Sequence, residues 1–140
     1  MNLKAISPVI ATVIIVSVAI AIAVAVAFWM TGITGLFTRY EKIEVISAYA
    51  VKSDANFEIK VSVKNTGTTT ATIDNIFING IPYNDPSIGA TVTPSLPQTL
   101  DPGGSIDFTI TISGFSSGQI VEVKLHTASG NEYPKSVQLP

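Results

Sequence analysis

The sequence predicts an α+β protein, in which a long hydrophobic helix at the amino terminus is followed by an all-β sandwich. Two observations lead to this prediction. No charged residue occurs within residues 5–38, a run of 34 positions. After Glu41 the apolar residues instead recur at every second position, which is the period of a strand with one buried face. We therefore expect the helix over residues 6–38 and the sandwich over residues 39–140.

The uncharged segment is long enough to cross a membrane as a single helix. As a helix it would span about 50 Å at ~1.5 Å per residue, whereas a bilayer core of about 30 Å needs only about 20 residues. Small and branched residues alternate over residues 19–28, so the helix has no polar face and must be buried all round. Five small residues would allow neighbouring helices to approach closely: Ala19, Ala21, Ala23, Ala25 and Ala27.

Two simpler interpretations of this segment stay open. A secretory signal peptide could be cut at one of the Ala-Val-Ala triplets of residues 23–27, although the apolar stretch before them exceeds the ~7–15 residues of a signal peptide. A plain transmembrane anchor explains the length, but it does not explain the residues Lys-Ala-Ile-Ser-Pro-Val-Ile-Ala at positions 4–11.

Those first residues, LKAISPVIATVII at positions 3–15, resemble the amino terminus of archaeal type IV pilins. Precursors of that family carry a short basic leader that a prepilin peptidase removes on the cytoplasmic side. The resemblance implies that residues 1–5 are the leader and that cleavage follows Ala5, with Lys4, Ala5 and Ile6 as the processing site. It covers about the first thirty residues. Where bacterial pilins have a glutamate at the fifth mature position, this chain has Ile10.

The same resemblance implies a function. The chain would be a structural subunit, a major pilin, of an archaeal type IV adhesion pilus, with the helices forming the filament core and the sandwiches lying outside. Its partners would be copies of itself, the prepilin peptidase, the pilus assembly platform and, before assembly, the cytoplasmic membrane. The assembled form would lie at the cell surface. Two alternatives stay open, namely a minor or priming pilin and an extracellular binding module anchored by one helix.

The helix is expected to begin near Ile6 and to end between Gly35 and Glu44. Pro8 suits a first helical turn because the N–H that proline lacks would have no partner there. Ser7, directly before it, could serve as the N-cap. Gly32 and Gly35 weaken the helix and permit a bend or an end.

Six to eight short strands are expected after Glu41, and six of them can be placed. In residues 57–64 the apolar side chains of Phe57, Ile59, Val61 and Val63 alternate with polar ones, and two later segments show the same pattern. Turn signals rich in Asn, Gly, Pro and Ser separate the segments. The predicted strands cover residues 43–51, 57–64, 71–78, 105–112, 121–126 and 132–138.

This part of the chain also resembles the immunoglobulin-like sandwiches of archaeal pilins, archaellins and many cell-surface modules. In those domains one strand ends in Asn-x-Gly and a later strand follows Pro-Gly. The corresponding residues are VSVKNTGTTTATIDNIFING at positions 61–80 and LDPGGSIDFTITI at positions 100–112. The resemblance concerns the fold, and a fold does not define a function.

Composition argues against several functional classes. Residues 41–140 hold six lysines and ten acidic residues, a net charge of −4, so binding of nucleic acid is not expected. The absence of cysteine rules out disulfides and thiolate metal sites. The single histidine, His126, falls on the polar face of a predicted strand, where it is expected to be solvated. Calcium binding by Asn84, Asp85 and Asp101 is conceivable, but no pair of nucleophile and base is visible. We expect a protein that is not an enzyme and has no cofactor.

Overall fold

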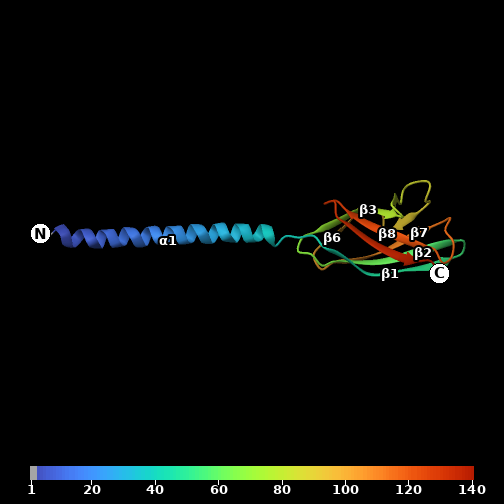
Figure 1. Cartoon of the computed structure of the whole chain (residues 1–140), viewed down its shortest axis with the longest axis horizontal. Coiled ribbons are helices and arrows are strands. Elements are labelled where there is room, and N and C mark those ends of the chain that lie inside the picture. The colour runs from blue at the N-terminus through green and yellow to red at the C-terminus, as the bar shows by residue number, and fades with distance from the viewer. Residues whose placement is uncertain (1–2) are drawn as a thin grey trace. The chain divides into compact units, whose positions relative to one another are not determined.

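The computed structural model describes the backbone of residues 3–140 and the side chains of residues 7–140. The chain divides between Arg39 and Tyr40 into two compact units. The first unit is a single helix, and the second contains two antiparallel sheets (Figure 1). The predicted α+β class, with a helix followed by a β-sandwich, is confirmed.

Helix α1 spans Leu3–Phe37 and continues through Gly32 and Gly35 without interruption. Its end at Phe37 falls inside the interval that the sequence predicts. In the uncut chain the helix begins before Ile6, so Pro8 is the sixth helical residue and lies beyond the first turn. Ser7 is accordingly inside the helix and not at its cap. The side chains of Lys4, Ala5 and Ile6 lie outside the described residues.

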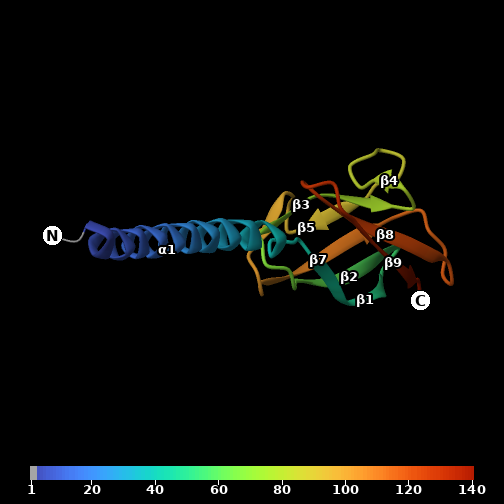
Figure 2. The ribbon, with the colours of Figure 1, turned by 60° about the vertical axis from the view of Figure 1, so that its left-hand side comes forward.

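The second unit is a sandwich of two sheets whose strand orders match those of an immunoglobulin domain (Figure 2). One sheet has the order β1-β2-β7-β5, which corresponds to A-B-E-D. In the other, β3, β8 and β9 correspond to C, F and G. The bounds of the first sheet are β1 Ile43–Ser53, β2 Asn56–Asn65, β7 Ser105–Ile112 and β5 Thr91–Thr93. Those of the second are β3 Ala71–Ile78, β8 Ile120–Thr127, β9 Glu132–Gln138, β4 Ile81–Pro82 and β6 Gln98–Leu100, with β4 and β6 both paired to β3.

The core between the sheets is built from the alternating apolar residues that the sequence points to. On β2, β7 and β8 the predicted inward residues are almost completely buried, with the exception of the half-buried Ile106. All six predicted strands are present. The short strands β4, β5 and β6 were not predicted, because two or three residues are too few to show an alternating pattern.

Strand β1 departs from regular pairing at one position. Val45 pairs with Val63 and Ser47 pairs with Ser62, so Ile46 is an extra residue in a β-bulge. The bulge leaves the Ile46 side chain 58% exposed, and Tyr49 beyond it is 52% exposed. Strand β1 therefore exposes two large apolar side chains, Ile46 and Tyr49.

A buried asparagine organises the end of the sandwich at which residues 40–42 lie. The Asn65 side chain donates from Nδ2 to the backbone oxygens of Thr69 (2.8 Å) and Leu100 (3.0 Å). Its Oδ1 accepts from the backbone N–H of Gly67 at 2.9 Å. A Cβ at Gly67 would lie 2.6 Å from the backbone oxygen of Tyr40, so only glycine fits there. These contacts give a physical reason for the Asn-x-Gly sequence.

The first residues of the sandwich are held by two further sets of hydrogen bonds. The backbone oxygen of Lys42 accepts from Thr66 (2.9 Å) and Gly67 (3.2 Å). The Glu41 carboxylate accepts from the hydroxyls of Thr127 and Ser129, each at 2.6 Å. Partial burial raises the pKa of Glu41, but hydrogen bonds from Ser129, Thr127, Asn131 and Tyr133 outweigh it and hold that pKa below its ordinary value.

Candidate functional site

The surface of α1 is the candidate functional site, because it is a large apolar surface that the described chain does not cover. From Val9 to Phe37 every large apolar side chain except Ile33 is exposed, and the exposed fractions run from 48% at Val26 to 83% at Phe37. Soluble monomers rarely leave contiguous apolar patches larger than a few hundred Å² open to water. This surface therefore requires an apolar partner.

The few hydroxyl groups of the helix do not interrupt its apolar character. Each of four side-chain hydroxyls donates back to the carbonyl oxygen four residues earlier, at 2.7–2.8 Å. A polar group satisfied within its own helix can enter an apolar medium at little cost. The four pairs are Thr12 with Pro8, Ser17 with Val13, Thr31 with Ala27 and Thr34 with Met30.

The five alanines singled out from the sequence form two rows on the helix. Residues four apart lie one above the other on a helix, so Ala19, Ala23 and Ala27 share one row. Ala21 and Ala25 form a second row about 200° away around the axis, at ~100° per residue. Rows of valine and isoleucine stand between them. The middle of the helix thus has a shallow groove on each of two opposite faces.

The apolar part of the helix is longer than a membrane requires. Residues Ser7–Phe37 are long and apolar enough to cross a bilayer. Their 31 residues span about 46 Å at ~1.5 Å per residue, against a hydrocarbon core of about 30 Å. About ten of these apolar residues would extend beyond the lipid tails if the helix stood upright.

The sandwich places the other predicted residues in ordinary structural roles. His126 is not simply solvated as predicted, because its Nδ1 lies 2.6 Å from Oδ1 of Asp74. This pair joins β8 to β3 across 52 residues of sequence, which a single-sequence pattern does not show. Asp85 accepts from the N–H and hydroxyl of Ser87, and the backbone oxygen of Asp101 accepts from Gly104. Among the described residues, no group of three or more His, Cys, Asp or Glu side chains is arranged to hold a metal ion.

Comparison with known proteins found distant likenesses. No family model matches the sequence. No curated protein matches it either. Among solved structures, the chain is similar to the archaellum periplasmic stator protein FlaG from Sulfolobus acidocaldarius, with 23% identity, a TM-score of 0.49, and coverage of 69% of this chain and 99% of that one.

Two further structures show weaker likenesses. A complex of FlaF and FlaG from the same organism gives 22% identity and a TM-score of 0.47, over 67% of this chain and 86% of that one. The secreted serine protease VesC from Vibrio cholerae gives 10% identity and a TM-score of 0.45. That likeness covers 71% of this chain and 22% of the protease. Because all identities are below 25% and all TM-scores below 0.5, these likenesses support no conclusion about what this chain binds or does.

Proposed function

We propose that this chain is a structural subunit of an archaeal type IV pilus, which polymerises through its amino-terminal helix into a helical filament. The observation that carries the proposal is the exposed apolar surface around the whole of α1. In the precursor this surface would lie in the membrane. In the filament the same surface would lie against identical helices, so one apolar environment would replace another at small hydrophobic cost.

The length of the apolar surface favours a filament over a simple anchor. Lipid covers about 20 residues of an upright helix, whereas residues Ser7–Phe37 number 31. The surplus residues need an apolar partner outside the membrane. A bundle of identical helices supplies one along the full length of α1.

The two grooves favour an assembly that continues beyond a pair. A closed dimer needs one contact face on each helix. Here alanine rows lie on two opposite faces, so a second and a third copy can each pack closely against the first. A contact between two different faces of identical subunits can repeat from one subunit to the next. It generates an open helical filament when the rotation between successive subunits does not close a ring.

The position of Pro8 supports removal of a leader. In a helix that begins at Leu3, Pro8 is the sixth residue, where its ring crowds the preceding turn and the carbonyl of Lys4 lacks a donor. After a cut behind Ala5 it would be the third residue, where a helix loses nothing by the missing N–H. The resemblance of residues 3–15 to archaeal pilins points to the same cut, and it brings in a prepilin peptidase and an assembly platform as partners.

A second candidate is an extracellular binding module tethered by one membrane-spanning helix. The sandwich has its own complete core, which is what such a module needs. A minor or priming pilin is a variant of the first proposal. In each of these roles the protein acts by binding or assembly and not by catalysis.

The candidates differ in where the chain is found and how it is processed. We expect intact-mass measurements on material sheared from the cell surface to show chains that begin at Ile6. Sheared chains that begin at Met1 would be consistent with filament formation but would contradict the proposed cleavage behind Ala5. Chains confined to the membrane fraction would reject the filament and favour the tethered module. Fragments that begin near Phe28 would indicate a signal peptide.

A further inference from the structure

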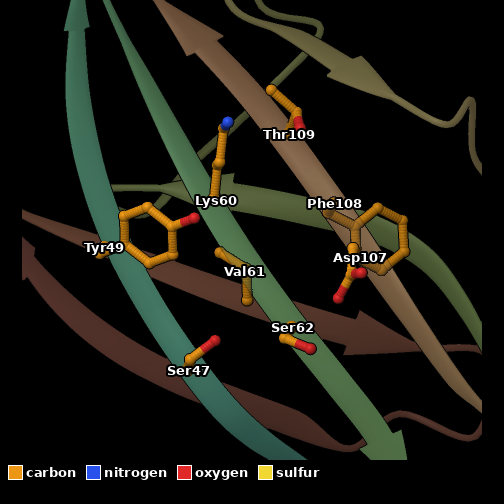
Figure 3. Close-up of a pocket in the computed structure, with 8 residues that line it drawn as sticks. All are labelled: Ser47, Tyr49, Lys60, Val61, Ser62, Asp107, Phe108 and Thr109. Atoms are coloured by element: carbon orange, nitrogen blue, oxygen red, sulfur yellow. The ribbon is translucent and has the colours of Figure 1, made fainter.

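The outer face of the first sheet contains a depression of about 300 Å³ over strands β1, β2 and β7, with polar and apolar atoms in its lining (Figure 3). Two cross-strand rows form it. In one row Tyr49 pairs with Lys60 and Lys60 with Thr109. In the other Ser47 pairs with Ser62 and Ser62 with Asp107. The core residues Val61 and Phe108 complete its lining.

The side chains around this depression leave their polar atoms available. Figure 3 shows the Tyr49 ring broadside, with its hydroxyl directed across β2. Lys60 extends toward the end of the depression where Thr109 lies, and the Asp107 carboxylate lies on the side of Ser62. Within the part of the chain that the structure describes, Lys124 pairs with Glu132 and the His126 ring lies against Asp74, so neither Lys60 nor Asp107 takes part in such a contact.

The chemistry of the lining excludes several kinds of ligand. An added peptide strand would need free backbone groups, but β2 is already paired with both β1 and β7. One carboxylate does not make a cation site, and one lysine on a domain of net charge −4 does not attract a phosphate-rich partner. An acyl chain would leave the surrounding hydroxyls and charges unpaired.

We propose that this depression binds a neutral saccharide. One positive and one negative side chain leave the lining without net charge. Hydroxyls such as those of Ser47, Ser62 and Thr109 both donate and accept, which matches the hydroxyls of a sugar. The exposed ring of Tyr49 offers a flat apolar surface to the C–H face of a pyranose. The volume lies at the lower end of the range of about 300–1,000 Å³ for ligand pockets, which suits a ligand of about one sugar ring.

This proposal does not depend on filament formation, because the depression lies wholly within the sandwich. It is tested with the full-length, ¹⁵N-labelled chain in micelles of a phosphocholine detergent, since sugar-headed detergents would compete. The probes are the methyl glycosides of glucose, galactose and mannose. We expect at least one of them to shift the amide signals of Tyr49, Lys60 and Asp107 saturably, with a half-saturation of about 1–10 mM.

Variants separate ring stacking from general effects. Tyr49→Ala should weaken the response about tenfold, because the ring contact is lost. Tyr49→Phe keeps the ring and should stay within about threefold of the original. Tyr40→Ala removes a tyrosine that is also about half exposed (51%) but lies outside the depression, and it should change nothing.

Other outcomes would overturn the proposal. One is the absence of saturable shifts with all three glycosides up to about 100 mM. Another is a response that Tyr49→Ala leaves unchanged. Equal shifts with glycerol, which has hydroxyls but no ring, would show that a ring face is not recognised. Shifts with glycine and with none of the glycosides would assign the depression to a zwitterion that pairs with Lys60 and Asp107.

Discussion

Replacing Ala23 by arginine is expected to abolish filaments while the sandwich stays folded. Ala23 lies in the middle of one alanine row, with apolar side chains around it on every side. An arginine at the centre of a helix in an apolar environment costs about 2.5–3.5 kcal/mol or more. Every subunit of a filament would carry that cost, and the side chain would also fill the groove. Electron microscopy of sheared material, with immunoblots of the membrane fraction, measures the effect.

Two companion variants separate packing from membrane insertion. Ala23→Leu fills the groove without a charge, so it should enter the membrane normally and still reduce filaments strongly. Ala23→Ser keeps a small side chain whose hydroxyl can bond back to the carbonyl of Ala19, as Ser17 does with Val13, and it should preserve filaments. Ser136→Arg, on exposed β9, is the control for an added charge. Normal filaments from both Ala23→Arg and Ala23→Leu would contradict the assignment of this row to the filament core.

Replacing Asn65 by alanine is expected to destabilise the sandwich by about 3–5 kcal/mol. The Asn65 side chain is fully buried and makes three hydrogen bonds to backbone groups. Its removal leaves the oxygens of Thr69 and Leu100 without this partner, while the N–H of Gly67 keeps only its longer bond to the backbone oxygen of Lys42 at 3.2 Å. Each buried group left unsatisfied costs about 1–3 kcal/mol.

Amide hydrogen exchange of the full-length chain measures this change. The slowest amides of β2 and β7 report the global stability of the sandwich, and their exchange should accelerate at least a hundredfold. The matched control is Asn56→Ala at the opposite end of β2, where the side chain is exposed and the change should stay within about 0.5 kcal/mol. If the β2 and β7 amides exchange equally slowly in Asn65→Ala and in the unchanged chain, the Asn65 hydrogen bonds do not stabilise the sandwich.

The sequence contains enough information to predict the long elements of the fold. Alternation along β2, β7 and β8 is unbroken, so their inward faces could be assigned residue by residue. The β1 bulge was not predicted, because the apolar residues only change phase after Val45 and the register with β2 is needed to show that Ile46 is extra. The start of α1 was placed at Ile6 because the expected cut falls behind Ala5, whereas the helix of the uncut chain begins at Leu3.

The candidate site was only partly predictable for a related reason. The alanines follow from the sequence, but their division into two opposite rows follows from helix geometry. In the sandwich, the contacts that matter join distant segments. The Asn-x-Gly sequence at residues 65–67 was recognised as the end of a strand, whereas the bond from Asn65 to Leu100 spans 35 positions. The depression around Tyr49 and Asp107 arises from pairing across three strands, which the local pattern of any one strand cannot show.

The central claim, that α1 leaves the membrane and becomes buried in a filament, can be measured directly because the chain has no cysteine. A single Val26→Cys substitution places a thiol on the helix surface, and Ser136→Cys places one on the exposed face of β9. Sheared, membrane-free material would be treated with a charged, membrane-impermeant maleimide before and after dissociation in detergent. We predict that the thiol at position 136 is labelled at both stages and the thiol at position 26 only after dissociation. Equal labelling of both thiols in the intact sheared material would contradict the account.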